Sequence, residues 1–596
     1  MRATRAGCSG CGSNEFGSAS RKKGETAMTK RASIESTADA YLELLAARGV
    51  EYFFANSGTD FAPLIDAYAR RLAQGQPVPR PMTVPHETPA VGMAHGYAMV
   101  TGRPQVVMVH VIVGAGNAVS GIINAARSNV PILFSAGRNP LTETGLHGSR
   151  NRPIHWAQES FDQGAMIREF VKWDYELRNF TQLETVVDRA LALTQAEPQG
   201  PVYLTLPREV LAEKHEVFEY AAASRAPRPG AVLAAPETIA EAARLLIAAR
   251  NPIILTKAAG RDPLAVPALV KLAEALGAPV IDQFHTHMNF PQDHPLHAGF
   301  DAAPYFDDAD CVVAVESDVL WFPALKAPRP ETKIVQIAVD PLFARYPIRG
   351  FPADAALSGT VSLNLTALAE AVRQRADGRA VGERTQRWHA EHRRLREAWA
   401  AAARKVQNER PLEMLWVSKC VGDLVDENTI LVDEYDFDPT QGCFRTPRSY
   451  FGSSPAGGLG WGMGAALGAK LAAPDKTVIC CVGDGAYIFS APTAAHFVSR
   501  AYNLPVLFVI FNNRAWNAVK RAVRGHAPEG VAARTGQMPI SDLEPAPDYE
   551  LVCRASGGHA ERVEDPAALP DALARALKVV RDEKRQALLN VICKKP

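Results

Sequence analysis

Two polar clusters in the C-terminal part of the chain have the residue types of a metal site. The first is Gly483-Asp484-Gly485, and the second, Asn512-Asn513, begins after 26 intervening residues. A carboxylate and an amide carbonyl suit a hard cation such as Mg2+, which prefers oxygen ligands and keeps room for phosphates. The clusters therefore predict a site for a metal and a diphosphate. A Gly-Asp-Gly turn in an ordinary strand–helix–strand unit is the alternative interpretation.

The segments around these clusters are suited to bringing them together. Lys476 to Val482 and Pro505 to Phe511 are apolar and have the length of buried parallel strands. Ala486 to Ala501 is expected to form the crossover helix between them. Parallel strands deliver their carboxyl ends to one edge of the sheet, where α/β domains bind ligands. The glycines beside Asp484 are expected to let the backbone turn sharply at that edge.

The Gly-Asp-Gly and Asn-Asn clusters at this spacing resemble the signature of thiamine diphosphate enzymes, in the acetolactate synthase and benzoylformate decarboxylase branch. The resemblance extends from about residue 35 to the C-terminus. It implies thiamine diphosphate and Mg2+ as cofactors, with Asp484 and Asn513 binding the metal through side-chain oxygens and Ala515 through its carbonyl. It also places Gly483, Gly485 and Asn513 at the cofactor. FAD, which some relatives bind, is left open by the resemblance and has no supporting motif.

A glycine-rich segment, Ala456 to Gly464 (AGGLGWGMG), resembles the family loop that holds the cofactor bent. The match implies that the Gly457 carbonyl accepts a hydrogen bond from the cofactor's 4′-amino group and that Leu459 lies between its two rings. Glycine suits such a loop because the backbone must approach the pyrimidine closely. The loop precedes a strand, so it does not fit a dinucleotide fingerprint.

Glu87 is the first candidate catalytic residue of the N-terminal part. It lies in VPHETPAVGMAHGYAMVTGRP, which resembles the family segment where a glutamate opens a helix lined with small residues. The resemblance implies that Glu87 hydrogen-bonds nitrogen N1′ of the aminopyrimidine and promotes the tautomer that accepts the C2 proton. An acidic residue that only complements the helix dipole is the alternative.

His110 is the second candidate. It lies in the C-terminal half of Val106 to Val113, an expected strand, and the segment aligns with the benzoylformate decarboxylase type, where an active-site histidine stands at this position. Imidazole can gain or lose a proton near neutral pH; a buried core histidine is the alternative. Val111 to Gly114 replaces the Ser-Gly-Pro-Gly run of acetolactate synthases, and Trp321, Phe322 and Pro323 occupy the region of the second histidine of the decarboxylase type.

Three further segments are predicted to border the site. In FFANSGTDFAPL, Thr59 takes the place of a small polar family residue that touches the substrate, with Asn56 nearby; a simple turn is the equal alternative. Gln158-Glu159 matches a family element that we interpret mainly as structural. The acidic loop Glu434 to Asp438 is expected either to be solvated or to disfavour bulky anionic substrates.

Composition excludes several other classes. The 596 residues carry a net charge of +1, with 47% hydrophobic and 22% charged residues, which is typical of a globular protein without an electrostatic case for nucleic acid. No apolar run approaches the ~20 residues of a membrane span. Nine cysteines in so long a chain favour a reducing cytoplasm. Cys8 and Cys11 form a CxxC without a second pair, which supports zinc only weakly.

Alternation of strand and helix patterns predicts an α/β fold with three consecutive doubly wound parallel-sheet domains. The expected order is a disordered tail (1–32), a pyrimidine-binding domain (33–215), a central domain (237–376) and a diphosphate-binding domain (411–596). Ala221 to Pro236, rich in Pro and Ala, reads as a linker, and the charged stretch Arg373 to Arg404 as a helical connector.

The expected function is thiamine diphosphate-dependent cleavage or formation of a C–C bond next to a carbonyl, above all 2-oxo acid decarboxylation with carboligation. The alternatives are a lyase or hydrolase acting on 2-hydroxy ketones or 2-hydroxyacyl-CoA, and a non-catalytic homologue, which would be expected to lose Glu87 or Asp484. A nicotinamide enzyme is disfavoured because the loop from Asn56 to Thr59 has no GxGxxG. The family pairs head to tail, which implies a homodimer or homotetramer with Glu87 of one chain facing Asp484 of another.

Overall fold

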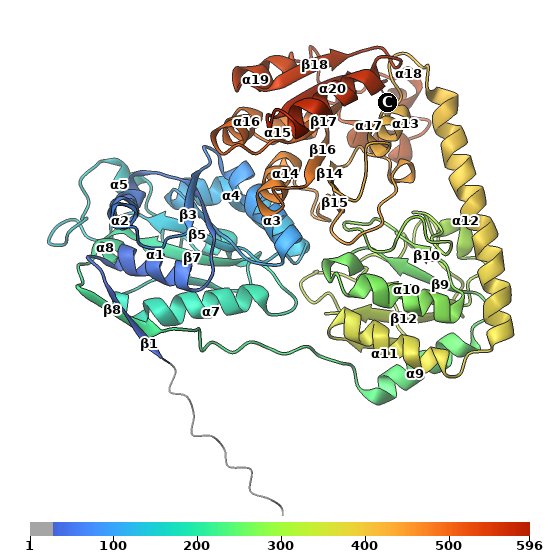
Figure 1. The fold of residues 1–596 in the computed structure, drawn as a ribbon, viewed down its shortest axis with the longest axis horizontal. Coiled ribbons are helices and arrows are strands. Elements are labelled where there is room, and N and C mark those ends of the chain that lie inside the picture. Colours follow the sequence, from blue (N-terminus) through green and yellow to red (C-terminus); the bar gives the residue numbers. More distant parts are fainter. Residues whose placement is uncertain (1–27, 596) are drawn as a thin grey trace, which may run out of the picture.

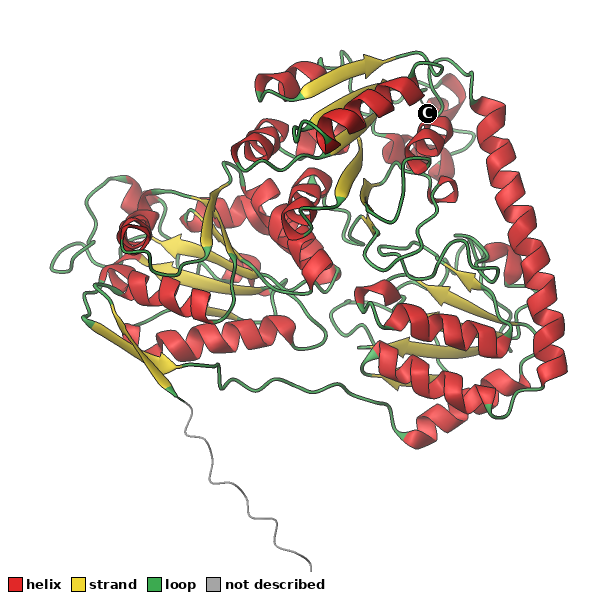
Figure 2. Cartoon of the chain, in the orientation of Figure 1, coloured by secondary structure: helices red, strands yellow, loops and turns green. Residues whose placement is uncertain are grey.

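The computed structural model describes residues 28–595, so the Cys8–Cys11 pair lies outside the described residues. Three parallel sheets follow one another along the chain, each packed against helices (Figure 1, Figure 2). The expected α/β fold class with three doubly wound domains is therefore confirmed. No helix in the described part of the chain is long and apolar enough to cross a membrane.

The N-terminal sheet has the strand order β3-β2-β4-β5-β7-β6. Its strands are β2 (Tyr52–Asn56), β3 (Arg80–Thr83), β4 (Val106–Val109), β5 (Leu133–Arg138), β6 (Asp174–Glu176) and β7 (Val202–Pro207). The main helices are α1 (Thr37–Ala47), α2 (Ala62–Ala73), α3 (Glu87–Thr101), α4 (Val111–Arg127) and α7 (Leu183–Gln195). The order reverses between β2 and β4, so the carboxyl ends of these two strands border the crevice where such sheets bind ligands.

The C-terminal sheet repeats this topology in the order β15-β14-β16-β17-β19-β18. Its strands are β14 (Thr429–Glu434), β15 (Tyr450–Gly452), β16 (Thr477–Gly483), β17 (Leu507–Asn512), β18 (His559–Val563) and β19 (Ala587–Ile592). Its helices include α13 (Met414–Gly422), α14 (Trp461–Ala472), α15 (Asp484–Phe489), α16 (Pro492–Ala501), α17 (Asn517–His526) and α20 (Leu569–Arg581). The corresponding switch point lies between β14 and β16.

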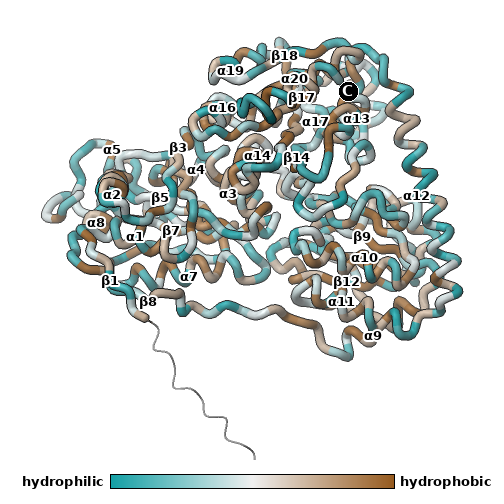
Figure 3. Tube along the Cα trace, in the orientation of Figure 1, coloured by the Kyte–Doolittle hydropathy of each residue, from teal (hydrophilic) through white to brown (hydrophobic). Residues whose placement is uncertain are grey.

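The central sheet is smaller, with the order β10-β9-β11-β12-β13. Its strands are β9 (Pro252–Thr256), β10 (Val280–Ile281), β11 (Cys311–Val315), β12 (Lys333–Ala338) and β13 (Ala355–Ser358), and its helices α9 (Pro236–Ala248), α10 (Ala265–Leu276) and α11 (Val361–Arg373). The charged connector is one long helix, α12 (Gly378–Val406), which runs along the outside to the C-terminal domain (Figure 1). Apolar stretches concentrate in the strands of each domain, and α12 is largely hydrophilic (Figure 3).

Three predicted elements need correction. The strand expected over Val106 to Val113 ends at Val109, and Val111 already begins α4. The single helix expected over Ala486 to Ala501 is two helices, α15 and α16, which are separated because Pro492 begins a new helix after Ala491, a residue with φ of 48°. Residues 29–32, expected to belong to the tail, form part of β1 (Thr29–Ser33), which pairs antiparallel with β8 (Val217–Ala221). Residues 1–27 of the expected tail lie outside the described residues.

The N- and C-terminal domains share one hydrophobic core cluster across α3 and α14. The two helices lie so close that a Cβ on Gly96 would stand 2.0 Å from the carbonyl oxygen of Ala465. A Cβ on Gly468 would stand 2.0 Å from the carbonyl oxygen of Met93. Because the obstructing atoms belong to the backbone, this contact depends on glycine at both positions.

Gly96→Ala is expected to lower the urea midpoint of unfolding, because the new methyl group must push two packed helices apart. Overpacking of this kind typically costs about 1–3 kcal/mol. Gly382→Ala is the matched control, since Gly382 lies inside α12 with no atom within 4 Å of its Cβ position. The control should match or exceed the wild-type midpoint. An equal midpoint for Gly96→Ala would contradict the close contact of α3 and α14.

Candidate active site

Glu87 is a buried carboxylate at the start of α3, and its side chain is held by two amides. The residue is 5% exposed. Asn56, the last residue of β2, donates from Nδ2 to Glu87 Oε1 at 2.9 Å, and Asn117 of α4 donates to Oε2 at 3.3 Å. These contacts fix the carboxylate at the switch point of the N-terminal sheet. A residue serving only the helix dipole would not need two side-chain donors from other elements.

His110 follows β4 directly and is the residue before α4. Its Nδ1 pairs with Asp60 Oδ1, and its Nε2 lies 3.4 Å from Nε2 of Gln158. The hydrogen bond to Asp60 is the main cause that raises the pKa of His110 above its usual value, and the charge of Glu87 adds to it. The next residue, Val111, has φ of 33°, a strained conformation for a β-branched side chain. The half-buried His110 is thus held by specific polar contacts at the same edge as Glu87.

Two neighbours of His110, Asp60 and Gln158, contact its imidazole, which the sequence did not indicate. Gln158, interpreted mainly as structural, contacts the imidazole. Asp60 was not singled out at all, although it directly follows the predicted Thr59. Thr59 itself is exposed and begins a short 3-10 helix, η1 (Thr59–Phe61). This turn places Asp60 in contact with the His110 ring. No local pattern marks Asp60, because its partner is 50 residues away.

The loop before α14 is held by contacts that the sequence did not reveal. Asn124 of α4 donates from Nδ2 to the Gly458 carbonyl at 2.8 Å and accepts from the Gly458 N–H at 3.0 Å. The Glu434 carboxylate accepts the N–H groups of Gly460, Trp461 and Gly462, at 2.7, 3.3 and 2.6 Å. A carboxylate is favoured there because the first turn of a helix leaves N–H groups without partners. Gly457 has φ of 69°, and Leu459 packs against the shared core.

The acidic loop Glu434 to Asp438 is therefore not the solvated loop that was one interpretation of the sequence. Glu434 and Phe437 are buried, and burial raises the pKa of Glu434 to about 7. Asp436 lies against the metal-site strand, because a Cβ on Gly483 would stand 2.2 Å from its Oδ2. Tyr435 is exposed and has φ of 80°. The loop packs between β14 and the expected metal site.

Asp484, Asn513 and Ala515 lie at the carboxyl ends of β16 and β17, as predicted. Asp484 is 1% exposed, and its buried Oδ2 has no hydrogen-bond partner among the described residues. Burial raises the pKa of this carboxyl to about 6. Asn513 Oδ1 accepts the Ala515 N–H at 2.9 Å and keeps a second lone pair. A carboxylate oxygen without a partner, beside an amide oxygen, fits an oxygen-ligated Mg2+.

The glycines on either side of Asp484 do not form the expected sharp turn, and they are required for a different reason. Gly483 has φ of −70°, which any residue can adopt, and Gly485 lies within α15. What excludes a side chain is space: a Cβ on Gly485 would stand 2.2 Å from the Trp516 ring, and one on Gly483 would meet Asp436. Trp516 therefore packs directly over the Gly-Asp-Gly segment.

The site residues form two groups. One group, around Glu87 and His110, belongs to the N-terminal domain, and the other, around Asp484 and the Gly457 loop, to the C-terminal domain. Among the described residues, the hydrogen bonds of Glu87 go to Asn56 and Asn117, and none reaches the second group. Helix α4 touches both, with His110 before its first turn and Asn124 near its end.

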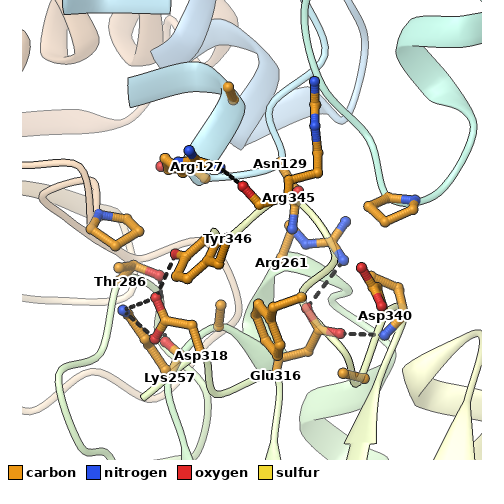
Figure 4. Close-up of a pocket in the computed structure, with 18 residues that line it drawn as sticks. Arg127, Asn129, Lys257, Arg261, Thr286, Glu316, Asp318, Asp340, Arg345 and Tyr346 are labelled. Atoms are coloured by element: carbon orange, nitrogen blue, oxygen red, sulfur yellow. Dashed lines mark hydrogen bonds and ion pairs between the residues drawn. The ribbon is translucent and has the colours of Figure 1, made fainter. Parts of the chain in front are cut away.

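A pocket between the N-terminal and central domains is separate from these groups. It lies at the carboxyl ends of β9, β11 and β12, where Lys257 binds Asp318 at 2.6 Å and Arg261 binds Glu316 at 3.2 Å (Figure 4). Arg127 of α4 donates to the Arg345 carbonyl at 2.6 Å across its rim. None of the predicted site residues lines it, and its two ion pairs lie within the central domain.

Fold and site together define a three-domain α/β enzyme whose first and third domains share one topology and carry the polar site residues. The chain belongs to the thiamine pyrophosphate enzyme family. Models of the family's N-terminal TPP binding domain, central domain and C-terminal TPP binding domain match residues 35–166, 239–368 and 440–591. The family resemblance expected from the sequence motifs is confirmed.

Relatives of known identity lie in the expected branch. Benzoylformate decarboxylase of Pseudomonas aeruginosa is 27% identical over 504 residues, which are 82% of this chain and 88% of the relative. The acetolactate synthase isozyme 3 large subunit of Escherichia coli is 26% identical over 521 residues, 84% and 86% of the two chains. The 4-hydroxybenzoylformate decarboxylase structure of Rhodococcus jostii RHA1 covers 94% of this chain and 99% of its own, with a TM-score of 0.75 and 21% identity, and shares the fold.

Proposed function

We propose that this chain is a thiamine diphosphate- and Mg2+-dependent 2-oxo acid decarboxylase that can also join its product to a second carbonyl. The observation that carries the choice is the placement of His110 beside Glu87. A histidine whose pKa is raised carries a proton near neutral pH. It can donate this proton after CO2 is lost, and the product is then released as an aldehyde. The names of two relatives, benzoylformate decarboxylase and acetolactate synthase, correspond to decarboxylation and to joining of two carbonyl compounds.

Each group of residues has a role in this proposal. Bound thiamine diphosphate supplies the electron sink for the C–C bond that breaks. Asp484, Asn513 and the Ala515 carbonyl would hold the metal, and Gly483 and Gly485 would lie beside the diphosphate. The Gly457 carbonyl and Leu459 would fix the bent shape of the cofactor. Glu87 would hold a proton at N1′, and Thr59 and His110 would face the substrate.

We further propose that a second copy of the chain completes the site, in a homodimer or homotetramer. Exposed apolar side chains support this, because they flank both groups of site residues. Val113 is 47% exposed in the first turn of α4, and Phe489, 53% exposed, ends the helix that Asp484 begins. A reducing cytoplasm is the proposed compartment, in keeping with the seven free cysteines of the described residues.

The first test is CO2 and aldehyde release from pyruvate and benzoylformate with thiamine diphosphate and Mg2+. We expect turnover in the wild type and a fall of about 100- to 10,000-fold in His110→Gln, the range for loss of a general acid. His559→Gln is the matched control, because His559 also pairs with a carboxylate, Glu561, but on the outer strand β18. Cofactor binding without turnover of either acid would contradict the proposal and favour 2-hydroxy ketones or acyl-CoA compounds.

A further inference from the structure

Asp60 and His110 are enclosed between two glycines. A Cβ on Gly58 would stand 2.1 Å from His110 Nδ1, and a Cβ on Gly137 of β5 would stand 1.8 Å from Asp60 Oδ2. Asp60 is 3% exposed, and its Oδ2 has no hydrogen-bond partner among the described residues. The contact between the Asp60 carboxylate and the His110 imidazole therefore requires glycine at both positions.

The electrostatic surroundings favour a positive imidazole. The carboxylates acting on His110 are Asp60, from η1, and Glu87, from α3. Burial opposes the charge, but the hydrogen bond to Asp60 outweighs it and raises the pKa of His110. A buried carboxylate also needs a compensating partner, since an unpaired buried charge is costly.

Gln158 completes the arrangement on the other side of the ring. Its Nε2 lies 3.4 Å from His110 Nε2, and its buried Oε1 has no partner within the described part of the chain. Rotation of the Gln158 amide by 180° exchanges the places of its oxygen and nitrogen. Turning it brings Oε1 to His110 Nε2, which is a hydrogen bond only when Nε2 carries a proton. A doubly protonated His110 thus donates from Nδ1 to Asp60 Oδ1 and gives Gln158 Oε1 a partner at Nε2.

We propose that Asp60 is the positioning residue that keeps His110 doubly protonated, so that Nε2–H is the proton donor of the reaction. This inference rests on the proposed decarboxylase function. Release of CO2 leaves an electron pair on the former carboxyl-bearing carbon, and that pair takes the Nε2 proton to form a C–H bond. His110 is left neutral, with Nδ1–H still donated to Asp60, and regains its proton from water. One proton is consumed for each CO2 released, and no oxidant or reductant is needed.

NMR titration of His110 in the purified protein tests the pairing without any substrate. With the signal assigned by His110→Gln, we expect a wild-type pKa above 6.5 and a fall of about one unit or more in Asp60→Asn, because an opposite charge at contact shifts a pKa by this amount. Gly137→Ala should act in the same direction, since its methyl group displaces the Asp60 carboxylate. Asp188→Asn, which removes a carboxylate paired with Arg48 instead, should leave His110 unchanged.

The pH profile of kcat/KM separates a catalytic role from a merely structural one. His110 with a raised pKa is the acid below that pKa and loses the proton above it, so activity should fall on the alkaline side. In Asp60→Asn this alkaline limb should move to lower pH by the same shift that NMR records. Any stability from the pair is likewise complete below about pH 6.5 and lost as pH rises through the raised pKa.

Each outcome has one meaning. An unchanged His110 pKa in Asp60→Asn and Gly137→Ala overturns the inference, whatever the activity. If neither variant folds, a wild-type His110 pKa at or below 6.5 overturns it. A shifted pKa with an unmoved alkaline limb also overturns the positioning role. A shifted pKa in a protein that turns over no 2-oxo acid contradicts the proposed function instead, and leaves the Asp60–His110 pairing in place.

Discussion

Glu87→Gln is expected to lower kcat by about 100- to 10,000-fold while thiamine diphosphate still binds. Gln has the size of Glu, and its Oε1 can still accept from Asn56 Nδ2. Its Nε2 donates, so the Asn117 amide, which donates to Glu87, must turn to present its oxygen, and the fold of this region should then persist. What the amide cannot do is exchange a proton with N1′ of the aminopyrimidine. The loss should therefore appear in kcat rather than in the cofactor Kd.

Cofactor binding and turnover must be measured on the same preparation to make this result decisive. Glu184→Gln is the matched control, because Glu184 lies in the same domain and pairs with Arg48 rather than with the site. It should retain wild-type kcat. A Glu87→Gln enzyme with kcat within threefold of wild type would exclude Glu87 from proton activation and support the dipole interpretation of its position in α3.

Asp484→Asn is expected to weaken Mg2+-dependent binding of thiamine diphosphate by more than about 100-fold. Removal of residues that only support a metal ligand already costs about 10- to 100-fold. Asp484 is expected to contact the metal itself, and its buried Oδ2 has no partner among the described residues to compensate for a lost ion. The substitution removes the formal charge without changing the side-chain volume, so the fold should be retained.

Calorimetric titration with Mg2+ present and with EDTA measures this effect. Asp571→Asn, an exposed carboxylate in the first turn of α20, is the control and should bind the cofactor as the wild type does. Equal affinity in Asp484→Asn and wild type would contradict a metal at Asp484. Tight binding that persists in EDTA would contradict a metal at this edge altogether.

Much of the fold follows from local patterns. Apolar runs of strand length such as Lys476 to Val482, bounded by glycine and proline, mark buried parallel strands. The residues at their carboxyl ends, Asp484 and Asn513, are then brought together by topology alone, since parallel strands share one edge. The same logic indicates that His110, in the C-terminal half of its expected strand, lies toward the ligand edge of the N-terminal sheet, whereas Glu87 was identified through the family resemblance.

The parts that could not be predicted depend on contacts between distant segments. Val106 to Val113 is apolar throughout, and nothing within it distinguishes a strand from the start of a buried helix at Val111. The partner of Asp60 is 50 residues away, that of Asn124 is 334 residues away, and those of Glu434 are at least 26 residues away. The roles of these residues therefore appear only in three dimensions. Pro492 was a visible signal for the break between α15 and α16.

Titration of thiamine diphosphate into the wild-type protein, with and without Mg2+, tests the central claim most directly. We expect saturable binding with Mg2+, at one cofactor per chain, and loss of that binding in EDTA. Binding accompanied by CO2 release from a 2-oxo acid would support the whole proposal. Absence of cofactor binding in the presence of Mg2+ would contradict it, whatever the fold.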